Sequence, residues 1–224
     1  MIEKKKIEAC INLVEKFVPC EPESSCGFEQ PPVEEQILGV ESEFDIIIPP
    51  PIRDSLTALS FRVTWDLCEP DDAPEIYEDA CAGTFCWILD WIKNVELHRR
   101  HFTKSKLPKL KISDEYWNQS FAFSNFTSIH DFEPYDGFLA IDLTKGDDFP
   151  VIILDSYHKS ICHGATIAPS LTEFLDQMCS LAFVTANTNV CAQLTGNFKK
   201  PLDSKCEFAK NWLHWLTTGE SITK

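Results

Sequence analysis

Residues 136–155 read DGFLAIDLTKGDDFPVIILD, and this stretch decides the fold class. Asp136-Gly137 is a turn signal, after which two apolar runs, 138–143 and 151–155, flank a polar and acidic connection. Two such runs joined by a turn-rich segment are typical of a β-hairpin. The sequence therefore predicts antiparallel strand pairing in the second half of the chain.

Helical patterns lie on both sides of this hairpin. Residues 1–18 carry apolar side chains at helical spacing. Ser170 with Glu173 forms a capping box ahead of an apolar stripe that runs to Ala182, and Ser204 with Glu207 repeats the capping box before a last helix. Further helices are predicted near residues 32–40, 51–59 and 91–102, and further strands at residues 61–67, 84–90, 121–123 and 161–168.

This order of elements predicts an α+β protein with a single domain. We expect a largely antiparallel or mixed central sheet with helices packed on it. The predicted organisation is an N-terminal helix and loop (residues 1–26), an α+β domain (residues 27–183) and a C-terminal helical extension (residues 184–224) packed on the same domain. A chain of 224 residues is long enough to bury a core without disulfides or metals.

The composition restricts the partners. The chain has 35 acidic and 20 basic residues, a formal net charge of −15, which repels nucleic acid and anionic lipid headgroups and attracts basic proteins. It has no apolar run long enough to span a membrane and no signal-peptide pattern at its start. We therefore expect a cytoplasmic protein that binds neither nucleic acid nor membrane, and whose cysteines are mostly core thiols.

A search for catalytic and metal motifs finds only fragments. Cys81-x4-Cys86 with His98-x2-His101 misses the usual zinc spacing, and Ser156-x-x-Lys159 lacks the motifs that accompany SxxK in enzymes. Cys162-His163 is the best covalent candidate, yet neighbours on a strand point to opposite faces. We predict no catalytic residue, no metal ligand and no cofactor, and keep a nucleophilic Cys162 or Ser156 as an alternative.

The chain resembles the SUKH superfamily through an ordered set of motifs. The resemblance is carried by Gly27-Phe28-x-x-Pro31-Pro32-x-Glu34-Glu35-x-Ile37, Val40-Glu41-x-x-Phe44-x-Ile46-x-Ile48-Pro49, Trp65-x-Leu67, Gly83-x-Phe85-x-Trp87-x-Leu89, Trp117-x-x-Ser120-Phe121-x-Phe123, Asp136-Gly137-Phe138-Leu139-Ala140-Ile141-Asp142-Leu143, Pro150-Val151-Ile152-x-Leu154 and Gly164-x-x-Ile167-Ala168-Pro169-Ser170-Leu171-x-Glu173-Phe174-Leu175. It covers the chain from about Gly27 to Phe183.

Resemblance to this superfamily implies a domain that binds proteins and catalyses nothing. Bacterial members resemble immunity proteins that neutralise toxins, many of them nucleases, and fungal relatives of the Smi/Knr type resemble regulatory hubs. We expect an immunity protein whose partner is a basic toxin domain, with a hub that has no toxin partner as the alternative. An acidic inhibitor suits a basic nuclease because opposite charges accelerate association.

The predicted partner surface is the acidic segment that follows the strand at residues 61–67. Carboxylates there would steer the encounter, and exposed aromatic side chains would anchor the complex. The predicted surface consists of Trp65, Asp71, Asp72, Glu75, Tyr77, Glu78 and Asp79.

Overall fold

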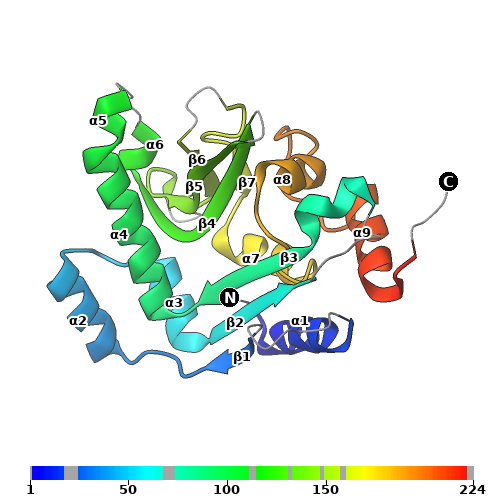
Figure 1. The fold of residues 1–224 in the computed structure, drawn as a ribbon. Coiled ribbons are helices and arrows are strands. Elements are labelled where there is room, and N and C mark those ends of the chain that lie inside the picture. The colour runs from blue at the N-terminus through cyan, green and yellow to red at the C-terminus, as the bar shows by residue number, and fades with distance from the viewer. Residues whose placement is uncertain are drawn as a thin grey trace.

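A computed structural model describes residues 2–17, 25–67, 74–110, 115–130, 133–146, 149–156 and 160–220 of the chain (Figure 1). Helices and strands are mixed along the chain, and the predicted α+β class is confirmed. In chain order the elements are α1 (Lys4–Phe17), β1 (Cys26–Glu29), α2 (Glu34–Phe44), α3 (Pro50–Ala58), β2 (Ser60–Asp66), the 3-10 helix η1 (Glu75–Ala80), β3 (Ala82–Trp87), α4 (Leu89–Ser105), α5 (Leu107–Leu110), α6 (Glu115–Asn118), β4 (Ser120–His130), β5 (Glu133–Asp142), β6 (Val151–Asp155), β7 (Thr166–Ala168), α7 (Leu171–Cys179), α8 (Thr188–Thr195) and α9 (Glu207–Thr218).

The strands form two antiparallel sheets. Sheet A has the order β1-β2-β3, and sheet B has the order β4-β5-β6-β7. The predicted hairpin is present as β5 and β6, in which Ile141 pairs with Val151 and Gly137 pairs with Asp155. Antiparallel pairing is therefore confirmed, although it is divided between two sheets.

Sheet B is covered on both faces. Leu139 and Ile153 point into the main core, whereas Phe138 and Ile152 point into a second cluster that includes Phe102 of α4. Burial on both faces explains why β6 is a continuous apolar run without the alternation of a half-exposed strand.

Sheet A is covered completely on one face and only in part on the other. Phe61, Val63 and Trp65 of β2 are buried in the main core, while Arg62 and Thr64 point to the opposite face and are partly exposed. This period-two alternation is that of a half-buried strand, and it confirms the strand predicted at residues 61–67. The outer face of sheet A consequently remains partly open to solvent.

A buried ion-pair network attaches α4 to sheet B. Glu96 accepts hydrogen bonds from Arg99 (Nε at 2.8 Å, Nη2 at 2.6 Å) and from Arg100 (Nε at 2.9 Å). Its Oε2 also accepts the backbone N–H of Ala122 at 2.9 Å, next to a register shift in the β4–β5 ladder. The carboxylate thus satisfies a strand N–H beside the bulge, and Arg99 donates in turn to the carbonyl of Trp117.

The C-terminal residues add two helices to the main core. Helix α9 confirms the predicted last helix, and the indole N–H of Trp212 donates to the carbonyl of Ala80 at 3.1 Å. The cap differs from the prediction, because the Cys206 thiol, rather than Ser204, accepts the N–H of Ala209. Helix α8 was not predicted, although Val190, Cys191 and Leu194 form a buried stripe at helical spacing. The main core draws side chains from residues 1–26, 27–183 and 184–224 alike.

Sheet A meets the segment after α7 at a tight contact. The Trp65 indole N–H donates to the carbonyl of Ala182 at 2.7 Å, and Ala182 and Phe183 both have left-handed backbone angles, with φ of 50° and 49°. A Cβ on Gly83 would lie 2.2 Å from the Trp65 Nε1 and 2.7 Å from the Phe183 carbonyl oxygen. Only glycine fits at this place, which is a requirement of packing.

Three local predictions differ from the structure. The strand predicted at 161–168 is reduced to Thr166–Ala168, because 161–164 form a turn. The strand predicted at 84–90 ends at Trp87, where α4 begins two residues later. The helix predicted near residues 32–40 spans Glu34–Phe44, so Val33 precedes it and is exposed.

Candidate functional site

The two aromatic residues of the predicted partner surface are buried, so their predicted exposure is wrong. The Trp65 ring lies 6.3 Å from that of Trp212, and the Tyr77 ring stacks on Trp215 at 5.3 Å. Both contacts come from α9, and the position of α9 could not be inferred from the local sequence. Neither ring is available to anchor a partner.

The acidic residues of the predicted partner surface do not share one structural environment. Glu75 and Glu78 are exposed on η1. Asp79 is half-buried and fixed to the α8 region, because its carboxylate accepts Asn189 Nδ2 at 2.6 Å and its carbonyl accepts Asn187 Nδ2 at 2.9 Å. The remaining two predicted residues, Asp71 and Asp72, lie outside the described residues. Their steering role remains a prediction.

Cys162 lies in a turn where its thiol is fully buried. The thiol donates to Asp155 Oδ2 at 3.2 Å and contacts the Ser160 hydroxyl at 2.7 Å. Burial raises the pKa of the Cys162 thiol to about 12, and the Asp155 carboxylate adds to this rise while Ser160 opposes it. Activated cysteines have a lowered pKa, so this environment speaks against a nucleophile.

The histidine beside Cys162 is engaged elsewhere. His163 Nδ1 accepts the backbone N–H of Asp155 at 3.0 Å, and its ring stacks on Trp117. Ser156 is half-buried, and its SxxK companion Lys159 lies outside the described residues. These contacts give His163 a structural role.

The cysteines and histidines of the zinc fragment do not converge. The Cys81 thiol donates to the carbonyl of Tyr77, Cys86 lies on sheet A near Arg62, and His98 on α4 meets the edge of the Phe138 ring. Within the described ranges, no group of three or more His, Cys, Asp or Glu side chains is placed to hold a metal ion.

An open groove of about 490 Å³ lies between α2 and the outer face of sheet A. Ser60 and Arg62 of β2 line it from the sheet, one side of α2 forms a wall, and Ile88, Leu89 and Asp90 close one end where α4 begins. Figure 1 shows α2 beside the start of α4 and the connection to β1. The wall from α2 consists of Gln36, Gly39, Val40 and Glu43, and the rim beyond β1 consists of Glu29, Gln30 and Pro32.

The groove carries three carboxylates and one guanidinium. Glu29 lies 3.7 Å from Arg62 Nη2, and Asp90 lies 3.0 Å from Lys93 Nζ. Glu43 has no ion-pair or hydrogen-bond partner among the described residues. The local balance is therefore acidic, in agreement with the charge of the whole chain.

Helix α2 is held firmly at its C-terminal end. Glu41 Oε1 accepts Arg53 Nη2 at 2.5 Å and the backbone N–H of Ile48 at 2.8 Å. The left-handed Asp45 follows the helix, and its carbonyl accepts Arg100 Nη1 at 2.6 Å. These contacts to α3 and α4 fix the wall of the groove against the rest of the fold.

The groove was not predicted from the sequence. Its residues come from four separate segments, and only the fold places them together. Two signals were available on α2 alone: a glycine in the middle of a helix, and a carboxylate in its last turn with no basic residue nearby in that turn. Both features are unfavourable for a helix.

No protein-family model, no curated protein and no solved structure gives a significant match to this chain. In the part of the chain that the structure describes, none of the helices combines the length and the apolar character needed to cross a bilayer.

Proposed function

We propose that this chain is a non-enzymatic protein-binding domain that neutralises a basic toxin in the cytoplasm, in the manner of an immunity protein. The observation that carries the proposal is the surface at α2, which combines an excess of negative charge with exposed apolar side chains. Helix α2 holds Glu34, Glu35, Glu41 and Glu43 and no basic residue, and Arg53 of α3 pairs with two of these carboxylates, Glu34 and Glu41. Leu38 on α2 is 50% exposed, and Ile47 just after it is 79% exposed.

Such a surface fits a basic protein better than it fits a small substrate. Carboxylates distributed around apolar side chains accelerate the encounter with a positive surface, and the apolar side chains supply contact area once the complex forms. A nuclease toxin carries positive charge where it holds phosphate. An acidic inhibitor that covers this surface blocks access to it.

The order of the motifs that resemble the SUKH superfamily supports the same proposal. The resemblance extends over the hairpin of β5 and β6 and over α7. The proposed binding function requires no cofactor. The regulatory-hub alternative shares the binding chemistry and differs only in the partner.

Co-expression with the product of the adjacent gene tests the proposal. We expect that product to arrest growth of the host cell when expressed alone and to be harmless when this chain is present. Association of the two purified proteins should slow by at least about tenfold between about 50 mM and about 500 mM salt, because screening weakens the attraction. Unchanged growth arrest in the presence of this chain contradicts the proposal, and a stable complex without toxicity favours the hub.

A further inference from the structure

Helix α2 places two unfavourable residues on the wall of the groove. Gly39 lies in the interior of the helix, where glycine is less stable than alanine by about 1 kcal/mol. Glu43 lies in the last turn, where the helix dipole disfavours a carboxylate. Both residues face the same groove, although neither contributes to packing there.

Nothing in the fold requires either residue. A Cβ added to Gly39 would meet nothing within 4 Å, so a larger residue would be tolerated. The neighbouring carboxylate Glu41 is fixed by Arg53 and Ile48, whereas Glu43 has no such partner among the described residues. The wall of the groove is therefore open at Gly39, and one helical turn further along α2 the carboxylate of Glu43 has no partner among the described residues. A ligand can use this arrangement.

Arg62, on the sheet side of the groove, is incompletely paired. Its Nε is buried and has no hydrogen-bond partner among the described residues, and its ion pair with Glu29 measures 3.7 Å. The rest of the Arg62 side chain is accessible, since the side chain is 38% exposed and lines the groove, so its guanidinium can donate to a molecule there that carries an acceptor.

We propose that this groove is the docking site for a basic segment of the partner protein. A lysine or arginine side chain lies along Val40 and Leu89, which receive its aliphatic stem, and its cationic head pairs with Glu43. A backbone carbonyl of the same segment accepts from Arg62. This inference rests on the proposed function, since it names the partner chemistry of that same surface.

The charge of the groove selects this occupant over an anionic one. An anion at Arg62 would face three carboxylates, Glu29, Glu43 and Asp90, against two cations, Arg62 and the Lys93 that pairs with Asp90, so the groove keeps an excess of negative charge. The volume of about 490 Å³ lies within the roughly 300–1,000 Å³ of small binding sites, which suits a few side chains of a segment.

A basic peptide tests the site without the partner. The probe is the amidated, acetylated hexapeptide Val-Arg-Val-Arg-Val-Arg, titrated into the isotope-labelled full chain while backbone amide shifts are followed. The control peptide has glutamate in place of arginine. We expect the arginine peptide to shift the amides of Gly39, Val40 and Leu89, and the glutamate peptide to shift none of them.

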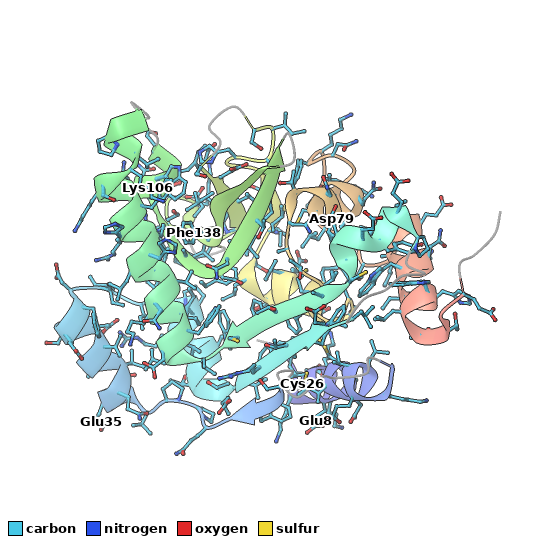
Figure 2. The ribbon with its side chains drawn as sticks, viewed as in Figure 1. Glu8, Cys26, Glu35, Asp79, Lys106 and Phe138 are labelled. Atoms are coloured by element: carbon cyan, nitrogen blue, oxygen red, sulfur yellow. The ribbon has the colours of Figure 1, made fainter. Side chains whose placement is uncertain are left out.

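Two matched pairs of variants separate docking from general attraction. Glu43→Lys and Glu35→Lys change the net charge equally, but only position 43 lines the groove; Glu35 lies at the outer side of α2 (Figure 2). Gly39→Leu and Ser42→Leu add the same side chain to the same helix, but only position 39 lines the groove. We expect Glu43→Lys and Gly39→Leu to weaken peptide binding at least tenfold, and Glu35→Lys and Ser42→Leu to change it less than twofold.

The outcomes decide the inference independently of the toxin. Equal losses for Glu43→Lys and Glu35→Lys, or shifts confined to other faces of the protein, overturn the groove as the docking site. Misfolding does not confuse the result, because a lysine in the last turn of α2 suits the helix dipole. If these variants lose the peptide but still neutralise the adjacent-gene product, the groove site is overturned as the partner's site while the proposed function stands. If the groove binds the peptide and no toxin is neutralised, only the proposed function fails.

Discussion

The two sheets of this protein differ in how completely they are covered. Sheet B lies between the main core and α4, so β6 is buried on both faces. Sheet A contributes one face to the core and leaves Arg62 and its neighbours on the other face beside an open groove. Both sheets contribute to the core, and the difference shows that only sheet A retains a face that packing leaves partly open.

The acidic residues follow the same division. At sheet B, Glu96 is buried and fully paired with Arg99 and Arg100. At sheet A, Glu43 borders the groove with no partner among the described residues. The same chemical group therefore has a structural role at one sheet and is available for binding at the other.

The largest predicted effect comes from breaking the network at sheet B. Glu96→Ala leaves two arginines and the Ala122 N–H without their acceptor, so the free energy of unfolding should fall by about 3–5 kcal/mol. Urea unfolding at neutral pH measures this loss. Asp90→Ala, at the exposed start of the same helix, is the control and should change stability by less than about 0.5 kcal/mol. Similar losses of stability for both variants would refute the structural role of the buried Glu96 network.

A second prediction concerns pH and the buried thiol near sheet B. The unfolded chain ionises Cys162 near its ordinary pKa of 9.0, whereas burial raises the pKa in the folded protein to about 12. Only the unfolded state gains charge between these values, so this contribution to stability is complete below pH 9 and is lost as pH rises toward 12. Between about pH 8 and about pH 10 the loss is about 1.4 kcal/mol.

Cys162→Ala isolates this contribution. The variant should lose about 1.4 kcal/mol less than the parent protein between the two pH values, as measured by urea unfolding. An identical pH dependence in both proteins would show that the thiol is not protonated more strongly in the folded state.

A third prediction sharpens the contrast at sheet A. Gly39→Ala should stabilise the protein by about 0.5–1 kcal/mol, because alanine favours a helix interior and a Cβ has free space there. Thermal unfolding at fixed pH measures the gain. Gly83→Ala, in contrast, should destabilise, since its Cβ would collide with Trp65. Destabilisation by Gly39→Ala would mean that the groove wall is packed.

The smallest predicted effect is that of Arg62→Ala. This side chain is partly exposed and has one long ion pair, so its removal should change stability by no more than about 0.5 kcal/mol. Urea unfolding gives the comparison with Glu96→Ala. A loss near that of Glu96→Ala would contradict the open character of this face.

The sequence predicted those parts of the fold in which local pattern and final environment agree. Strand β2 alternates because one face is exposed, and α7 begins where Ser170 accepts the N–H of Glu173. The sequence did not predict the burial of side chains whose environment is set by segments far along the chain. Trp65 and Tyr77 are buried by α9, more than 100 residues away along the chain. The groove depends on four segments meeting, which no local pattern reports.

The contact at Gly83 bears on how distant relatives of this chain could be detected. Position 83 accepts no side chain, position 65 must supply an indole donor, and positions 182 and 183 must tolerate left-handed backbone. These demands come from the geometry of the joint itself and are independent of whichever molecule is bound. A lineage that retains this architecture is therefore expected to keep a tryptophan and a glycine at this separation while its surface residues diverge.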